Sequence, residues 1–133
     1  MDRPRILLAD DHQLLLKRVT ALLSSVFDVV GAARDGVEMV SEALRLRPDV
    51  IVADISMPTL DGIEAAHQLR ERGSTAKVVF LTIHAEQEFV DACFAGGASG
   101  YVTKAHMKSD LIPAIRAALS GQSFVSSPDK PCN

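Results

Sequence analysis

The chain has 133 residues, enough for one domain that buries roughly two thirds of the surface of its unfolded state. Its apolar content of 47% supports a hydrophobic core, and no apolar run approaches the ~18 residues that a membrane span needs. The net charge of −3 excludes the strongly basic surface that nucleic-acid binding requires. We therefore expect a soluble domain that by itself binds neither a membrane nor a nucleic acid.

The location of the protein is indicated by its N-terminus and its cysteines. Only a short apolar run precedes Asp10, too short for the hydrophobic region of a signal peptide. Cys93 and Cys132 form no CxxC pair, and the sequence favours two free thiols in a reducing compartment over a disulfide. These features predict a cytoplasmic protein.

Short apolar runs alternate with stretches of helical periodicity through the first half of the chain. The expected elements are a strand over 5–9, a helix over 12–24, a strand over 27–33, a helix over 37–46, a strand over 49–53 and a helix over 62–72. The spacing of Val37, Val40 and Leu44 predicts that these side chains face the core from the second helix.

The second half continues the alternation. The expected elements are a strand over 77–82, a helix over 86–95, a short strand over 101–103 and a last helix. This last helix should begin near Ser109 or Asp110, because Pro113 is tolerated best in a first turn, and should bury Ile112, Ile115 and Leu119. The domain then covers residues 1–121, and residues 122–133 have the composition of a linker or tail.

Five strands joined by helices predict an α/β fold with a doubly wound parallel sheet and helices on both faces. With right-handed crossovers, the flavodoxin-like strand order 2-1-3-4-5 is the simplest topology. Ligand sites in such sheets lie at the carboxyl ends of the strands, where the strand order reverses. Here that point lies between the first and third strands.

Three carboxylates converge on this point. Asp10 and Asp11 follow the first strand, and Asp54 follows the third, whose β-branched run 49–53 is typical of a strand buried on both faces. At an effective dielectric constant of ~20, two like charges ~4 Å apart cost about 4 kcal/mol, so protons or a cation must compensate them. A set of oxygen ligands without a thiolate favours Mg²⁺ over zinc.

Two further polar residues end strands at the same edge of the sheet. Thr82 ends the fourth strand, and Lys104 follows the fifth. A hydroxyl donor and an ammonium beside a carboxylate and a divalent cation are the groups that a phosphoryl group on Asp54 would need. Each residue alone is ordinary, but their joint position predicts a phosphoryl site.

Together these residues resemble the receiver domain of bacterial two-component response regulators. The resemblance rests on Asp10 and Asp11, on the segments 54–62 and 98–104, and on Thr82, and it extends from residue 5 to about residue 121. The segments 96–104 and 110–116 and the tail 121–128 are most similar to the NarL/FixJ (LuxR-type) branch.

The resemblance implies a role for each matching residue. Asp54 would be the phosphoacceptor; Asp11, Asp54 and the backbone carbonyl of Ser56 would bind Mg²⁺ directly, with Asp10 assisting directly or through water. Thr82 and Lys104 would bind the phosphoryl oxygens. Tyr101 would be the aromatic switch that turns inward as Thr82 moves towards the phosphate.

The resemblance also implies a function and partners. The domain would take its phosphoryl group from a sensor histidine kinase. Its own chemistry would be limited to Mg²⁺-dependent self-phosphorylation from a phosphodonor and to autodephosphorylation, so it is not an enzyme in the usual sense. Phosphorylation would remodel the face of the fourth helix, fifth strand and fifth helix. That change would control a C-terminal helix-turn-helix output domain, absent from this chain, and would promote a homodimer.

Two residues depart from the family pattern. Ile83 is bulky where receiver domains often have a small residue, which would slow phosphodonor access or phosphate loss. Lys104 is followed by Ala105 instead of the usual proline, so a cis peptide bond here would cost ~3 kcal/mol more than a trans one.

Three other protein classes are weighed against a receiver. A haloacid-dehalogenase-type phosphatase needs an acidic residue two positions after its nucleophile, where this chain has Ser56. A flavodoxin-type carrier needs a Ser/Thr/Gly-rich phosphate loop where Asp10 and Asp11 would repel a phosphate. The strongest alternative is a pseudo-receiver, which keeps the fold as an interaction module without phosphorylation, although no required side chain is missing.

Overall fold

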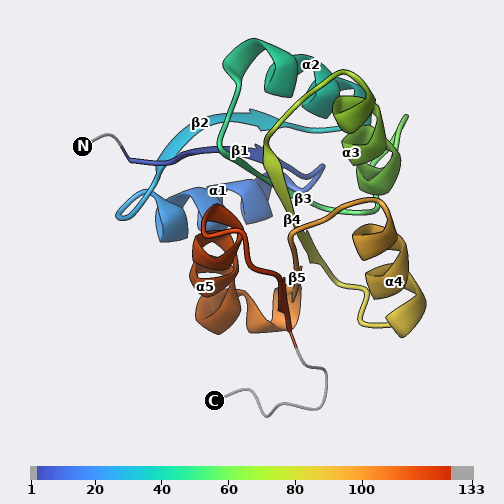
Figure 1. Cartoon of the computed structure of the whole chain (residues 1–133). Coiled ribbons are helices and arrows are strands. Elements are labelled where there is room, and N and C mark those ends of the chain that lie inside the picture. The colour runs from blue at the N-terminus through green and yellow to red at the C-terminus, as the bar shows by residue number, and fades with distance from the viewer. Residues whose placement is uncertain (1–2, 127–133) are drawn as a thin grey trace.

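The computed structural model describes residues 3–126, which form one parallel sheet with helices on both faces (Figure 1). The strands are β1 (Arg5–Ala9), β2 (Asp28–Ala33), β3 (Val50–Ala53), β4 (Lys77–Thr82), β5 (Gly100–Thr103) and β6 (Phe124–Val125). The helices are α1 (Gln13–Leu23), α2 (Gly36–Leu46), α3 (Gly62–Glu71), α4 (Gln87–Ala95) and α5 (Met107–Leu119), with a 3₁₀ turn, η1 (Lys104–His106), before α5.

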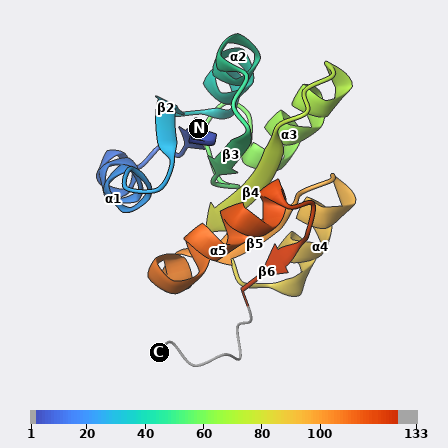
Figure 2. The same ribbon diagram turned by 60° about the vertical axis from the view of Figure 1, so that its left-hand side comes forward.

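The strand order is β2-β1-β3-β4-β5-β6. The predicted α/β class and the order 2-1-3-4-5 are therefore confirmed, but the predicted number of five strands is one too low. Residues 124–125, which the sequence analysis assigned to the tail, pair in parallel with Gly100 and Tyr101 and form β6 at the edge of the sheet (Figure 2). Two residues are too few to give a periodic signal, and their flanking serines resemble a linker.

The core consists of two layers, one on each face of the sheet. Helices α2, α3 and α4 cover one face with buried residues that include Met39, Ala65 and Cys93. Helices α1 and α5 cover the other, with Val19 and Ile115 among the buried residues. The sheet is thus shielded from water on both faces, which explains why the central strand β3 is apolar throughout.

The buried face of α2 differs from the predicted one. Val40 is buried as expected, but Val37 is 53% exposed and Leu44 36% exposed, whereas Met39 and Ala43 are buried. The helix is therefore rotated by about one residue relative to the prediction. Because the sets 36, 39, 40, 43 and 37, 40, 44 have similar helical spacing, the periodicity alone did not separate them.

The beginning of α5 was also predicted wrongly. The helix starts at Met107, and Pro113 lies inside it on the exposed side. Water can therefore reach the backbone carbonyl that the missing N–H of Pro113 leaves without a helical partner. Ile115 is buried as predicted, Ile112 is half-buried and Leu119 is 38% exposed.

Two predictions from composition concern the membrane and the thiols. Within residues 3–126, each helix is too short or too polar to span a bilayer. Cys93 is a buried free thiol, and burial raises its pKa to about 12. Cys132 lies outside the described residues.

Candidate functional site

Asp54 lies at the carboxyl end of β3, where the sequence placed it. Its side chain is almost fully buried, and its Oδ1 accepts a hydrogen bond of 2.7 Å from the backbone N–H of Ile55. The next loop is held close: Gly62 donates to the carbonyl of Ile55, and a Cβ on Gly62 would lie 2.0 Å from the carbonyl oxygen of Asp54. Asp61 caps α3 by accepting from the N–H of Glu64 at 2.8 Å.

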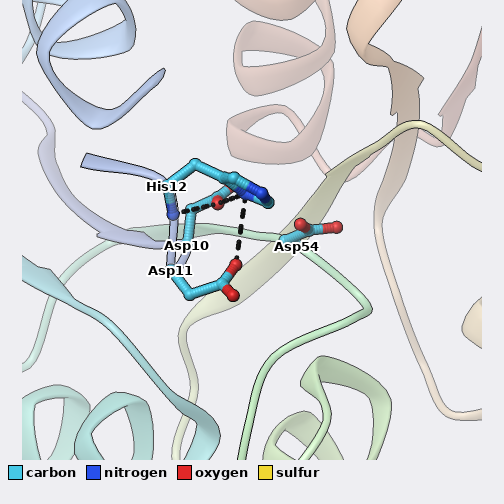
Figure 3. Close-up of side chains that lie close together, drawn as sticks. All are labelled: Asp10, Asp11, His12 and Asp54. Carbon is cyan, nitrogen blue, oxygen red and sulfur yellow. Dashed lines mark hydrogen bonds and ion pairs between the residues drawn. The ribbon is translucent and has the colours of Figure 1, made fainter. Parts of the chain in front are cut away.

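Asp10 and Asp11 follow β1 and lie beside Asp54 (Figure 3). Asp10 is buried, and Asp11 is more than one third exposed. One oxygen from each of the three carboxylates and one ring nitrogen of His12 lie within 4.8 Å of one another. The predicted convergence of three carboxylates from two neighbouring strands is therefore present in the structure.

His12 is the residue of this cluster that sequence reasoning missed. It was assigned only to the start of the first helix, and it is indeed the N-cap of α1. Its Nδ1 also lies 2.8 Å from Asp10 Oδ1 and 3.2 Å from Asp11 Oδ1 (Figure 3). Its position directly after the two carboxylates could have indicated this contact, since the turn into a helix can fold a side chain back onto the preceding residues.

Lys104 supplies the positive charge of the site. Its Nζ lies 3.0 Å from Asp10 Oδ2 and 3.1 Å from Asp54 Oδ2. Burial alone would lower the pKa of Lys104, but the hydrogen bond to Asp10 and the charges of both carboxylates outweigh it and raise the pKa above its usual value. The peptide bond between Lys104 and Ala105 is trans.

The charges of the cluster do not balance. Among residues 3–126, three carboxylates lie together, and the ammonium of Lys104 contacts the two buried ones, Asp10 and Asp54. Carboxylate oxygens at this spacing fit a hard divalent cation. The site therefore suits a divalent metal ion.

Thr82 lies at the end of β4 and Tyr101 on β5, the two strands that follow β3 in the sheet. Thr82 is fully buried, and its Oγ1 accepts a hydrogen bond of 3.3 Å from the backbone N–H of His84. Tyr101 is also buried, and its hydroxyl donates a hydrogen bond of 2.6 Å to the carbonyl of His84. Burial raises the pKa of Tyr101 above its usual value. In this structure the tyrosine ring lies inward, the position that the resemblance assigned to the phosphorylated state.

The side chain of His84 joins two loops at the rim. Its Nε2 lies 3.0 Å from the hydroxyl of Ser56, and its ring stacks on Phe89 with 4.2 Å between ring centroids. The predicted role of the Ser56 carbonyl stays a prediction, because the contacts of Ser56 involve its side chain. Ile83 is 74% exposed and points away from the core.

A second, larger cavity lies at the opposite end of the sheet. It has a volume of about 560 Å³, and Arg47, Arg72, Lys77, Leu44 and Leu119 are among the residues that line it. The two arginines are the C-caps of α2 and α3, where a cation offsets the negative end of the helix dipole. The size of this cavity is therefore no argument for placing the chemistry there.

Comparison with known proteins identifies the class of domain that this fold and site define. The sequence model of the response regulator receiver domain matches residues 6–116. The chain therefore belongs to the response regulator receiver family, and its most similar relatives place it in the NarL/FixJ branch. Receiver domains are not enzymes in the usual sense.

Individual relatives support this assignment. The chain is 36% identical over 124 residues to the response regulator GacA of Pseudomonas viridiflava, covering 92% of this chain and 58% of the relative. It is 32% identical to the response regulator UvrY of Escherichia coli, covering 92% and 57%. The chain thus spans a little over half the length of these curated relatives.

Solved structures agree with the sequence relatives. A LuxR-family two-component response regulator from Aurantimonas sp. SI85-9A1 superposes with a TM-score of 0.89 at 34% identity, covering 96% of this chain and 92% of that one. The signal receiver domain of the putative response regulator NarL from Mycobacterium tuberculosis gives a TM-score of 0.87 at 27% identity, covering 92% and 100%.

Proposed function

We propose that this domain is a phosphorylation-dependent switch of a two-component system and that Asp54 is its phosphoacceptor. The observation that carries the proposal is the contact of one ammonium, Lys104 Nζ, with both buried carboxylates, Asp10 and Asp54. The ammonium of Lys104 lies beside Asp54 Oδ2, where its positive charge can stabilise the incoming phosphoryl group.

The phosphoryl group would come from a phosphohistidine of a sensor kinase. A carboxylate oxygen of Asp54 forms a bond to phosphorus as the P–N bond to the imidazole breaks, and the leaving imidazole nitrogen takes up a proton from water. Lys104 neutralises one phosphoryl oxygen. Thr82 accepts one hydrogen bond in this structure, so its own hydroxyl proton is available to donate to another phosphoryl oxygen.

The donor set of the acidic cluster fits Mg²⁺. Carboxylate oxygens of Asp10, Asp11 and Asp54, with the backbone carbonyl of Ser56, would hold the ion. When bound, Mg²⁺ supplies the positive charge that offsets the excess of carboxylates and the negative charge of the phosphoryl group. We expect the same ion to support autophosphorylation from small phosphodonors and autodephosphorylation.

Phosphorylation would act on the surface formed by α4, β5 and α5, because Tyr101 is part of β5 and its hydroxyl contacts the loop after Thr82. The group adds about −1.5 to −2 charges and favours the position of Thr82 that leaves room for the inward ring. We propose that the chain is part of a cytoplasmic protein as long as the curated relatives. In that protein, this surface would control homodimerisation and a helix-turn-helix output domain that follows residues 122–133.

The test is incubation with acetyl phosphate and Mg²⁺, followed by measurement of the intact mass. We expect one added phosphoryl group, lost when Mg²⁺ is chelated and absent from Asp54→Asn. Asp91→Asn, at an exposed position on α4, is the matched control and should label like the parent. A chain that takes up no phosphoryl group would instead be a pseudo-receiver that acts as an interaction module.

A further inference from the structure

Residues 124–126, here called the docked segment, are held along the outer edge of β5. The backbone N–H of Phe124 donates to the carbonyl of Ser99 at 3.2 Å, and the N–H of Ser126 donates to the carbonyl of Tyr101 at 2.8 Å. Phe124 packs against the core layer formed by α1 and α5. Figure 2 shows β6 at the end of the sheet, beyond β5.

A polar contact fastens the end of the docked segment. Ser126 is 3% exposed, and its hydroxyl donates a hydrogen bond of 2.7 Å to Oδ2 of Asp110, which is 8% exposed. The other oxygen of Asp110 accepts from the hydroxyl of Ser109 at 3.0 Å. Two buried polar groups 16 residues apart are thus paired, and undocking the segment would leave Asp110 without the hydroxyl of Ser126.

A continuous path of contacts runs from the candidate phosphoryl site to this segment. His84 donates through its backbone N–H to Thr82 Oγ1 and accepts at its carbonyl from the hydroxyl of Tyr101. The backbone carbonyl of Tyr101 in turn accepts from Ser126. Tyr101 therefore contacts the β4–α4 loop through its side chain and the docked segment through its backbone.

We propose that the outer edge of β5 is a docking surface for this chain's own residues 124–126 and that their docking is thermodynamically coupled to the phosphoryl site through Tyr101. The coupling rests on the proposed function of Asp54. The docked segment favours the β5 position seen here, in which Tyr101 lies inward, and a phosphoryl group on Asp54 favours the same position. Any partner that pairs with the β5 edge must displace the segment first.

Thermodynamic coupling is reciprocal, which makes it testable from either end. If phosphorylation strengthens docking, then loss of docking must weaken binding of a phosphoryl mimic by the same factor. Couplings between sites usually amount to about 5-fold or more. We therefore expect undocking variants to bind beryllofluoride, in the presence of Mg²⁺, about 5-fold or more weakly than the parent chain.

Two proline substitutions form a matched pair. Ser126→Pro removes the N–H that donates to Tyr101, whereas Val125→Pro lies one residue earlier, where the N–H of an edge strand faces away from its neighbour. Val125 is 46% exposed, so its side chain contributes little to docking. Ser126→Ala keeps the N–H and removes the hydroxyl, and it should give a smaller change in the same direction as Ser126→Pro.

Two measurements read the coupling in the full chain. Fluorine NMR gives the affinity for beryllofluoride. Iodide quenching of fluorescence reports on Tyr101 alone, since the chain has one tyrosine and no tryptophan. Ser126→Pro should weaken beryllofluoride binding and increase the quenching, while Val125→Pro should match the parent. Circular dichroism checks that each variant is folded.

The outcomes separate this inference from the proposed function. If the parent and Ser126→Pro bind beryllofluoride with equal affinity, the coupling is refuted and the phosphoacceptor role of Asp54 stands. Equal losses in Ser126→Pro and Val125→Pro also refute the coupling, because the effect would then not depend on the hydrogen bond to Tyr101. A parent chain that does not bind the mimic contradicts the proposed function, and the coupling fails with it.

Discussion

Two buried aspartate sites at different places in the fold satisfy their charges in different ways. Asp110, in the first turn of α5, accepts hydrogen bonds from the hydroxyls of Ser109 and Ser126. The positive end of the helix dipole favours its charge. Asp54 and Asp10 share the single ammonium of Lys104 instead, and a third carboxylate lies beside them.

This difference indicates which of the two buried aspartate sites can bind a ligand. The carboxylate of Asp110 has its partners within the chain, so it stabilises the fold and holds the docked segment. The cluster around Asp54 has more negative charge than the chain neutralises, so a cation or a new group can still bind with a gain in free energy. An excess of like charge is therefore a better guide to a binding site than burial, because both aspartate sites are buried.

Removing the ammonium of Lys104 should have the largest effect on stability. Breaking a buried ion pair costs about 3–5 kcal/mol, and because Lys104 is partly exposed we expect Lys104→Ala to lose about 2–3 kcal/mol. Urea unfolding without metal measures this loss. Saturating Mg²⁺ should restore part of it by replacing the lost positive charge, while Mg²⁺ binding itself stays largely intact.

Lys108→Ala is the matched control, because Lys108 is an exposed lysine on α5. It should change the free energy of unfolding by less than about 0.5 kcal/mol. Equal stability losses in the two lysine variants would show that Lys104 does not neutralise the cluster.

A smaller effect is expected from removing one negative charge. Asp11→Asn should weaken Mg²⁺ binding about 10-fold or more, since even partners of metal ligands usually contribute about 10-fold. Without metal the variant should be slightly more stable than the parent, because one like-charge repulsion is relieved. Calorimetric titration with Mg²⁺ tests the ligand role, and a variant that binds Mg²⁺ as tightly as the parent contradicts it. Asp28→Asn, at an exposed position, serves as the control.

The smallest effect is expected at Asp110. Ser126→Ala removes one buried hydrogen bond to Asp110 and should lower the free energy of unfolding by about 1 kcal/mol. Its affinity for Mg²⁺ should not change, unlike that of Asp11→Asn. Ser123→Ala, at an exposed position, is the control. A change in the affinity for Mg²⁺ alone, without a phosphoryl mimic, would mean that Ser126 acts on the metal ligands and not only through Tyr101.

The sequence predicted the parts of the site that depend on strand ends. Asp10, Asp54 and Thr82 follow apolar runs, so their shared edge follows from the order of the sheet. The contacts of His12 and His84 could not be predicted, because they depend on how two loops fold back over the edge. Side-chain positions in loops depend on the tertiary structure more than on a periodic pattern.

Errors in the fold came from local ambiguity. In α2, Met39 is buried and Val37 is exposed, whereas the prediction placed Val37 in the core. Small residues such as Ala43 allow close packing that a hydrophobicity pattern does not show. The early start of α5 reflects an exposed Pro113, whose missing hydrogen bond water can replace. The pairing of Phe124 in β6 depends on a sheet edge that is distant in sequence.

The identity of the phosphorylated residue is tested most directly by trapping the acyl phosphate. The chain is phosphorylated with acetyl phosphate and Mg²⁺, reduced with borohydride, which converts an aspartyl phosphate to homoserine, and analysed by peptide mass spectrometry. We predict homoserine at position 54 and unchanged aspartates at positions 10 and 11. Homoserine at position 10 or 11, with Asp54 unmodified, would contradict the assignment of Asp54 as the phosphoacceptor.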